Sequence, residues 1–119
     1  MTKGIRITHD GFYSEFNFQS NQELQDGVNG YFEQINLIAI DGVSEGVMWV
    51  NEMGHGLVNT PASAISFIFG GASTITGNVV LSGATDDSGN DTDISAGIRQ
   101  LVEWSCIPQT KWDEENTNV

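Results

Sequence analysis

The chain has 119 residues, enough for one compact domain with one core and too few for two. It carries 16 acidic residues against four basic ones, which gives a net charge of −12. No Lys or Arg occurs between Arg6 and Arg99, and the only other bases are Lys3 and Lys111. Binding to nucleic-acid phosphates or to an anionic membrane surface depends on such side chains, so we exclude direct nucleic-acid and membrane partners.

The single cysteine, Cys106, cannot form an internal disulfide, which fits a reducing cytosol. The first residues alternate polar and apolar side chains and do not form the continuous apolar run of a secretion signal. We therefore expect the protein in the cytoplasm.

The first third of the chain predicts a β-hairpin followed by a helix. Residues 4–9 and 12–18 alternate in hydrophobicity, and Asp10-Gly11 between them is typical of a two-residue hairpin turn. Ser20 and Glu23 have the spacing of a capping box, which predicts a helix of about ten residues that ends at Gly30.

The middle of the chain predicts two strands and a second helix. Residues 31–40 are apolar on both faces near their end, so we expect a central strand, and residues 47–52 form the next. Thr60 is the expected N-cap of the second helix, with Pro61 at its first position and Gly70 after its end.

The last part predicts a strand over 75–83, an exposed loop over 84–92 and a helix capped by Asp93 that stops before Pro108. We expect residues 1–107 to form one domain and residues 108–119 an acidic, disordered tail.

These elements predict an α+β fold with a mixed or antiparallel sheet of about five strands and two or three helices. Our specific expectation is a grasp-like sheet with all helices on one face and the first helix across it.

Three segments of the chain resemble a known family. They are residues 24–33, which end a helix before a glycine; residues 49–54 (WVNEMG), followed by Leu57 and Asn59; and residues 75–81 (ITGNVVL). In order and spacing they resemble a small domain-of-unknown-function family common in bacteriophage and plasmid genomes, with the pattern V-N-E-x-G…L-x-x-N and then G-x-V-V. The resemblance covers roughly residues 4–95, and the family's usual proline after the leucine is displaced here to Pro61.

The resemblance implies a mobile-element origin and brings no known activity with it. Small intracellular phage proteins are often interaction or host-takeover factors, so this origin favours a role of that kind, including action against host defence.

The densest polar cluster is residues 51–56, beside the end of a predicted strand. Glu52 and His55 could act as an acid–base pair or as two metal ligands. The spacing matches no zinc signature, so we favour a loop in which polar groups bond the backbone and two glycines form the turn.

The acidic loop of residues 86–93 has the composition of a calcium site but not its spacing. Neither Asp86 nor Asp87 as first ligand places suitable side chains at positions 3, 5 and 6 of an EF-hand. We expect a solvated loop, and no metal or cofactor.

Residues 53–85 contain no charged side chain, so this segment is expected either in the core or at a contact between copies. Phe67 and Phe69 lie on opposite sides of the second helix, and they could anchor such a contact; Trp104 is a further candidate anchor. Trp112, among acids, could be a docking peptide, although a solubilising tail is favoured.

Three functions are weighed. The favoured one is an acidic, non-enzymatic protein that binds and modulates or blocks a host protein with a basic surface, such as a nucleic-acid-binding or defence protein. The alternative is a protein that sequesters a small ligand or nucleotide signal, with phosphate held by backbone amides at 60–63. Catalysis ranks lowest, because no nucleophile–base pair or metal cluster is found. The expected contact residues are Glu52, His55, Asp86, Asp87, Asp91, Asp93, Trp112, Asp113, Glu114 and Glu115.

Overall fold

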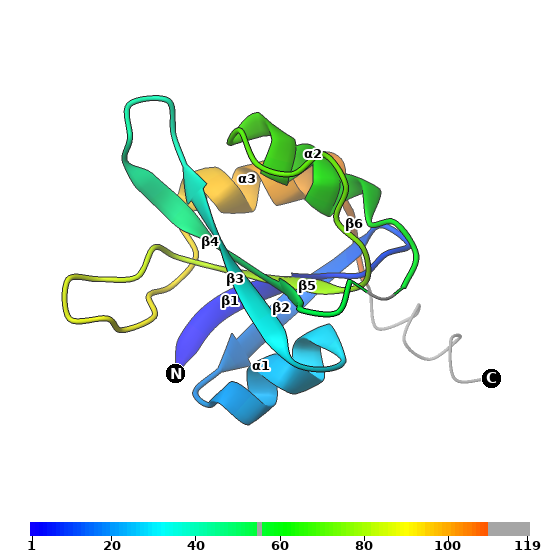
Figure 1. Ribbon diagram of the computed structural model, residues 1–119, viewed down its shortest axis with the longest axis horizontal. Coiled ribbons are helices and arrows are strands. Elements are labelled where there is room, and N and C mark those ends of the chain that lie inside the picture. The colour runs from blue at the N-terminus through cyan, green and yellow to red at the C-terminus, as the bar shows by residue number, and fades with distance from the viewer. Residues whose placement is uncertain (55, 110–119) are drawn as a thin grey trace.

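A computed structural model describes residues 1–54 and 56–109 (Figure 1). The elements are β1 (Thr2–Ile7), β2 (Phe12–Phe18), α1 (Asn21–Val28), β3 (Phe32–Ile38), β4 (Ser44–Asn51), α2 (Thr60–Ile68), β5 (Val79–Ser82), α3 (Ala96–Ser105) and β6 (Ile107–Pro108). All named strands join one sheet of order β3-β4-β5-β1-β2-β6. Only β6 runs parallel to its neighbour, β2, so the sheet is mixed. The α+β prediction is confirmed, and the described residues hold six strands where about five were expected.

Helices cover both faces of the sheet, so the expectation that they share one face is wrong. Helices α2 and α3 lie on one side and α1 on the other (Figure 1). The reason is visible in β4, where Val47, Met48, Trp49 and Val50 are all buried. Because successive side chains of a strand point to opposite faces, a strand buried at every position needs cover on both sides.

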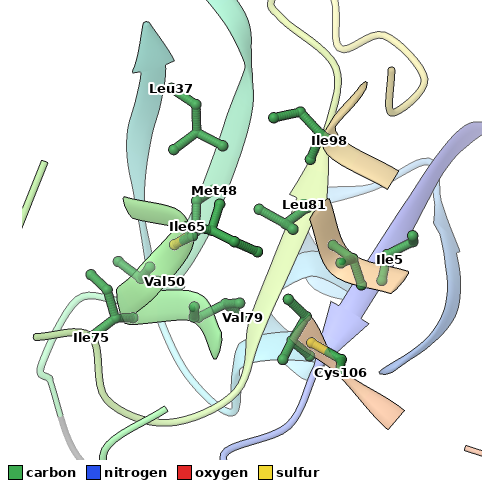
Figure 2. Packing of buried hydrophobic residues seen from close by; sticks show 13 residues of the cluster. Ile5, Leu37, Met48, Val50, Ile65, Ile75, Val79, Leu81, Ile98 and Cys106 are labelled. Carbon is green, nitrogen blue, oxygen red and sulfur yellow. The ribbon is translucent and has the colours of Figure 1, made fainter. Parts of the chain in front are cut away.

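The two faces hold two separate apolar clusters. The larger lies between the sheet and helices α2 and α3 (Figure 2), and it includes Met48, Leu81 and Ile98. The smaller lies under α1 and includes Phe18, Leu24 and Trp49. Together they bury one side of every helix, which fixes how the helices sit on the sheet.

The opening hairpin and the first helix form where they were predicted, but the hairpin loop has three residues, His9 to Gly11, and not two. Thr8 N donates to Phe12 O at 2.9 Å, and Gly11 N donates to Thr8 O at 3.0 Å. Strands β1 and β2 pair from Thr2↔Phe18 to Ile7↔Tyr13, and Gly11 in the turn has φ 92°. The backbone N of Glu23 donates to Ser20 Oγ at 3.2 Å, as the capping box requires.

The caps of the other two helices differ from the prediction. Asn59, not Thr60, caps α2, because its side chain accepts a hydrogen bond from Ala62 N. Ser95, not Asp93, caps α3, since its Oγ accepts from Ile98 N while Asp93 Oδ1 accepts from Lys3 N. A side-chain acceptor of either type can cap a helix, so sequence alone did not discriminate between neighbours.

Two strands also differ. The strand expected to be central, residues 31–40, is β3 at one edge of the sheet. The strand expected over 75–83 is shortened to Val79–Ser82, and Thr76 instead forms an isolated bridge with Val58.

The sheet includes residues beyond 107, the predicted last residue of the domain. Pro108 pairs with Tyr13, and Gln109 N donates to Tyr13 O at 2.8 Å. These bonds hold the chain to the sheet through residue 109. The remainder of the predicted tail, residues 110–119, lies outside the described residues.

Candidate functional site

The three segments that carry the family resemblance meet at one end of the sheet. Asn51, the last residue of β4, donates from Nδ2 to the carbonyl oxygens of Val28 at 3.1 Å and Asn29 at 3.2 Å. Its Oδ1 accepts from Met53 N at 2.9 Å. One side chain therefore ties the end of α1 to the loop that follows β4.

Asn59 joins the remaining parts of this end. Its side chain is fully buried, and its Nδ2 donates to Ile7 O at 3.2 Å and to Gly77 O at 2.8 Å. Its Oδ1 accepts from Ala62 N at 3.1 Å. Asn59 was not among the predicted site residues, although its place in the L-x-x-N pattern was the signal that could have identified it.

Close backbone approach explains two of the glycines. Gly30 has φ 154°, and a Cβ there would lie 2.8 Å from Asn51 Nδ2. Gly56 has φ 114°, and a Cβ there would lie 3.2 Å from the Cα of Gly77. The residues of the resemblance thus include several that hold the chain together, which supports the structural interpretation of the 51–56 cluster.

Two shallow pockets flank Asn51. One of about 310 Å³ is lined by His9, Val28, Asn29, Asn51, Gly56, Leu57, Gly77 and Asn78. The other, of about 200 Å³, is lined by Glu33, Val50, Asn51, Glu52, Gly54, Thr74, Ile75 and Thr76. Their polar linings are amides, hydroxyls, carboxylates and the imidazole of His9, with no Lys or Arg among these lining residues. They could bind a neutral or cationic group more readily than a phosphate.

The predicted contact acids are not brought together. Glu52 lies beside the smaller pocket, at the end of the sheet where β4 stops and β5 begins. The loop from Asp86 to Asp93 leaves the opposite end of β5, and Figure 1 shows it as the yellow loop away from α2's first turn. The prediction therefore covers at least two separate places on the surface.

The acidic loop is closed by its own hydrogen bonds. Asp86 Oδ1 accepts from Ser88 N and from Asn90 N, both at 2.9 Å. Thr92 Oγ1 donates to Ala84 O at 2.5 Å, which closes the loop at its base. This leaves Asp87 and Asp91 exposed on a formed loop, and burial of part of Asp91 raises the pKa of its carboxyl group. His55, Trp112, Asp113, Glu114 and Glu115 lie outside the described residues.

Charge pairing at the surface is sparse. Within residues 1–54 and 56–109 the one ion pair joins Arg99 to Glu15, at 2.5 Å from Nη1 to Oε1 and 3.2 Å from Nη2 to Oε2. This contact lowers the pKa of Glu15 and raises the pKa of Arg99. Arg6 is half-buried and donates from Nε to Gly27 O at 2.8 Å, and its burial lowers the pKa of the guanidinium.

The uncharged segment of residues 53–85 is buried only in part. Ala62 and Ile65 lie in the core, whereas Leu57 and Phe67 are each 68 % exposed. Phe69 packs against the larger cluster, so the two phenylalanines do lie in different environments, as expected. Trp104, on α3, is also exposed. Part of the segment therefore lies in the core, and a contact between copies through its exposed part stays a prediction.

Comparison of the chain with protein-family models, with curated proteins and with solved structures finds no match. The family resemblance consequently stays a prediction. Among the described residues no group of three or more His, Cys, Asp or Glu side chains could hold a metal ion, and no helix is long and apolar enough to cross a membrane.

Proposed function

We propose that this chain is an acidic interaction protein of phage or plasmid origin. It binds a host protein that has a basic surface, and it modulates or blocks that protein. The host proteins that fit best are nucleic-acid-binding or defence proteins, because their own ligands are negatively charged. The proposed role is binding and not catalysis.

The observation that carries the proposal is the shortage of paired carboxylates. Thirteen of the 16 acidic residues lie within the described residues, since the other three are at 113–115. Only Glu15 is in an ion pair there, and two of the three described cations are occupied by Glu15 and by a backbone oxygen. Such a surface carries a negative potential that speeds association with a basic partner and selects against acidic ones.

Exposed apolar side chains support an interaction role as well. Phe67 and Ile68 are 68 % and 62 % exposed at the end of α2, within the uncharged segment. Large apolar or aromatic side chains at a surface are the usual anchors of protein contacts, and charges around them set specificity.

The small-ligand alternative is less favoured at the place first expected. At the start of α2, Ala62 N bonds Asn59 Oδ1 and Ser63 N bonds Asn59 O, while Pro61 has no N–H. These amides are not open to a phosphate group. A thermal-shift series with nucleotides tests this alternative, and a concentration-dependent rise in melting temperature would favour it.

The test of the main proposal is capture from a bacterial lysate, followed by measurement of the affinity for each captured protein in rising NaCl. Two matched double variants, Asp87→Asn with Asp91→Asn and Glu33→Gln with Glu52→Gln, remove equal charge from opposite ends of the sheet. We expect a basic partner whose affinity falls with salt and falls more with one double variant than with the other. Captured proteins that are not basic, or whose binding ignores salt, would contradict the proposal.

A further inference from the structure

Strand β3 forms one edge of the sheet over its whole length, Phe32–Ile38. The opposite edge is different, because β6 has only two residues and one of them is Pro108. An edge strand leaves a row of backbone N–H and C=O groups without a ladder partner, and a long one is a template for another strand.

The direction of the free groups follows from the pairing with β4. Glu52 N donates to Tyr31 O at 2.8 Å and Ala39 N donates to Val43 O at 2.9 Å, so odd-numbered residues face β4. In an antiparallel ladder the alternate residues then point their N–H and C=O groups outward. Those residues are Phe32, Gln34, Asn36 and Ile38.

The outer edge of β3 is regular. The register passes from Leu37↔Gly46 to Ile38↔Ser44, so the extra residue of the bulge is Glu45 on β4. A bulge bends the strand that carries the extra residue, and here that strand is β4 and not β3. All four outward positions therefore keep strand spacing.

The edge also has little of the usual protection against pairing. Proteins commonly block exposed edges with Lys, with Pro or with an inward charge. Residues 31–40 contain neither Lys, Arg nor Pro, and Glu33 is the one charged residue among them.

We propose that β3 is the contact of a symmetric dimer, in which β3 of a second copy pairs with it antiparallel about a two-fold axis at Ile35. This register places Ile35 opposite Ile35, Gln34 opposite Asn36 and Phe32 opposite Ile38 of the second copy. It makes about eight backbone hydrogen bonds, two at each pair of outward-facing residues. The two sheets then form one continuous sheet across the dimer.

The strand is self-complementary in this register. Glu33 faces Leu37 of the second copy, so the two glutamates are four residues apart and their repulsion is weak. Two amides meet on one face, and Gln34 Nε2 already donates to Asn36 Oδ1 at 2.9 Å within one copy. The same pair can exchange bonds between copies.

A hollow beside the edge has room for a side chain of the second copy. A pocket of about 320 Å³ is lined by Gln34, Asn36, Ile38, Ser44 and Thr85. The proposed register brings Phe32 of the second copy next to Ile38, which is 45 % exposed, at the rim of this hollow. Burial of these two apolar side chains adds to the backbone bonds.

Net charge gives the dimer a distinctive salt dependence. Each copy carries −12, so two copies repel each other and salt screens the repulsion. Self-association is therefore expected to strengthen as NaCl rises, whereas binding to a basic partner weakens. The two proposals can be tested separately, because rising NaCl should strengthen self-association and weaken binding to a basic partner.

The first test is sedimentation velocity of the full chain over a range of concentrations at low and high NaCl. We expect the apparent mass to rise from 12.9 kDa toward twice that value, at lower concentration in high salt. A mass of one copy at every concentration and salt level would overturn the proposal.

Matched variants at Asn36 test the edge itself. Asn36→Pro removes an outward N–H and leaves the β4 ladder intact, so it should abolish the dimer while thermal melting shows a folded chain. Asn36→Ala keeps the N–H and should keep the dimer. If Asn36→Pro proves unfolded, Asn36→Lys, which places a charge on the edge, takes its place. A dimer that persists in the folded edge variant would place the contact elsewhere.

A disulfide tests the register. Across an antiparallel pair that lacks hydrogen bonds the Cα atoms are about 4.5 Å apart, within the range that a disulfide accepts. Ile35→Cys should link two copies under mild oxidation, and Glu33→Cys, which faces Leu37, should not. Equal linking by both, or by neither, would overturn the proposed axis.

Discussion

Asn59 and Ile7 are 52 positions apart in the chain, and a hydrogen bond of 3.2 Å joins the side-chain Nδ2 of the first to the carbonyl oxygen of the second. The same amide group also serves Gly77 O and caps α2 through its oxygen. One buried side chain thus connects the first strand, the second helix and the turn before β5.

Asn59→Asp should separate the two roles of this side chain. The carboxylate can still accept from Ala62 N, but it loses both donors and faces two carbonyl oxygens in a buried place. We expect a loss of about 2–4 kcal/mol in the free energy of unfolding, measured by urea denaturation, and a similar loss for Asn59→Ala. Thr60→Ala is the control, since Thr60 is exposed. A loss confined to Asn59→Ala would show that capping alone matters.

Two helical glycines should respond in opposite directions to alanine. A Cβ at Gly27 would lie 2.7 Å from Phe16 Cζ and 2.9 Å from Val80 Cγ2, whereas a Cβ at Gly97 meets nothing within 4 Å. Gly27→Ala should destabilise the protein by about 1–3 kcal/mol through overpacking. Gly97→Ala should stabilise it by up to about 1 kcal/mol through helix propensity. Thermal unfolding checks both, and equal effects would contradict the packing under α1.

Local features were predictable from the sequence because each depends on adjacent residues. The hairpin at Asp10-Gly11 and the Ser20 cap of α1 need only a few positions, and both are found, although the hairpin loop has three residues and not two. The presence of helices on both faces of the sheet could also have been predicted, because residues 47–50 are all apolar.

Strand order was not predictable, because it depends on pairings between distant residues. An edge strand is usually expected to be polar on one face, but β3 contributes apolar side chains to both clusters. Leu37 lies in the larger cluster. Phe32 packs edge-on against Trp49 of the smaller cluster, with the two ring centroids 5.2 Å apart. The apolar residues on both faces of β3 therefore indicated that helices cover both faces of the sheet. They did not indicate that β3 is a central strand of the sheet. The hydrogen bonds from the side chains of Asn51 and Asn59 to distant carbonyl oxygens could likewise not be predicted from the spacing of residues in the sequence.

The Glu15–Arg99 ion pair should contribute little to the free energy of unfolding, and the contribution should be absent at acid pH. Its side chains are 59 % and 33 % exposed, so Glu15→Gln is expected to cost at most about 1 kcal/mol. Because Arg99 lowers the pKa of Glu15, the contribution to stability is present at neutral pH and is lost as pH falls through the lowered pKa of this carboxyl group. Urea titrations at several pH values measure it.

The control for this pair is Asp87→Asn. Asp87 is exposed and in no ion pair within the described residues, so neutralising it should relieve repulsion and stabilise slightly at neutral pH. A destabilisation by Glu15→Gln that stays constant across the whole acid titration of the folded protein would argue against the ion pair as its cause.

The Cys106 thiol should be unreactive in the folded protein. The residue is 8 % exposed and packs in the larger cluster, and burial raises the pKa of its thiol to about 11. The thiolate is the reactive form, so at pH 8 alkylation by iodoacetamide should be slower by at least about tenfold than in urea-unfolded chain. Mass spectrometry of timed samples measures both rates. Cys106→Ser should lower stability by burying a hydroxyl, and Cys106→Ala should cost less. Alkylation of the native chain as fast as that of the unfolded chain would contradict the burial of this thiol.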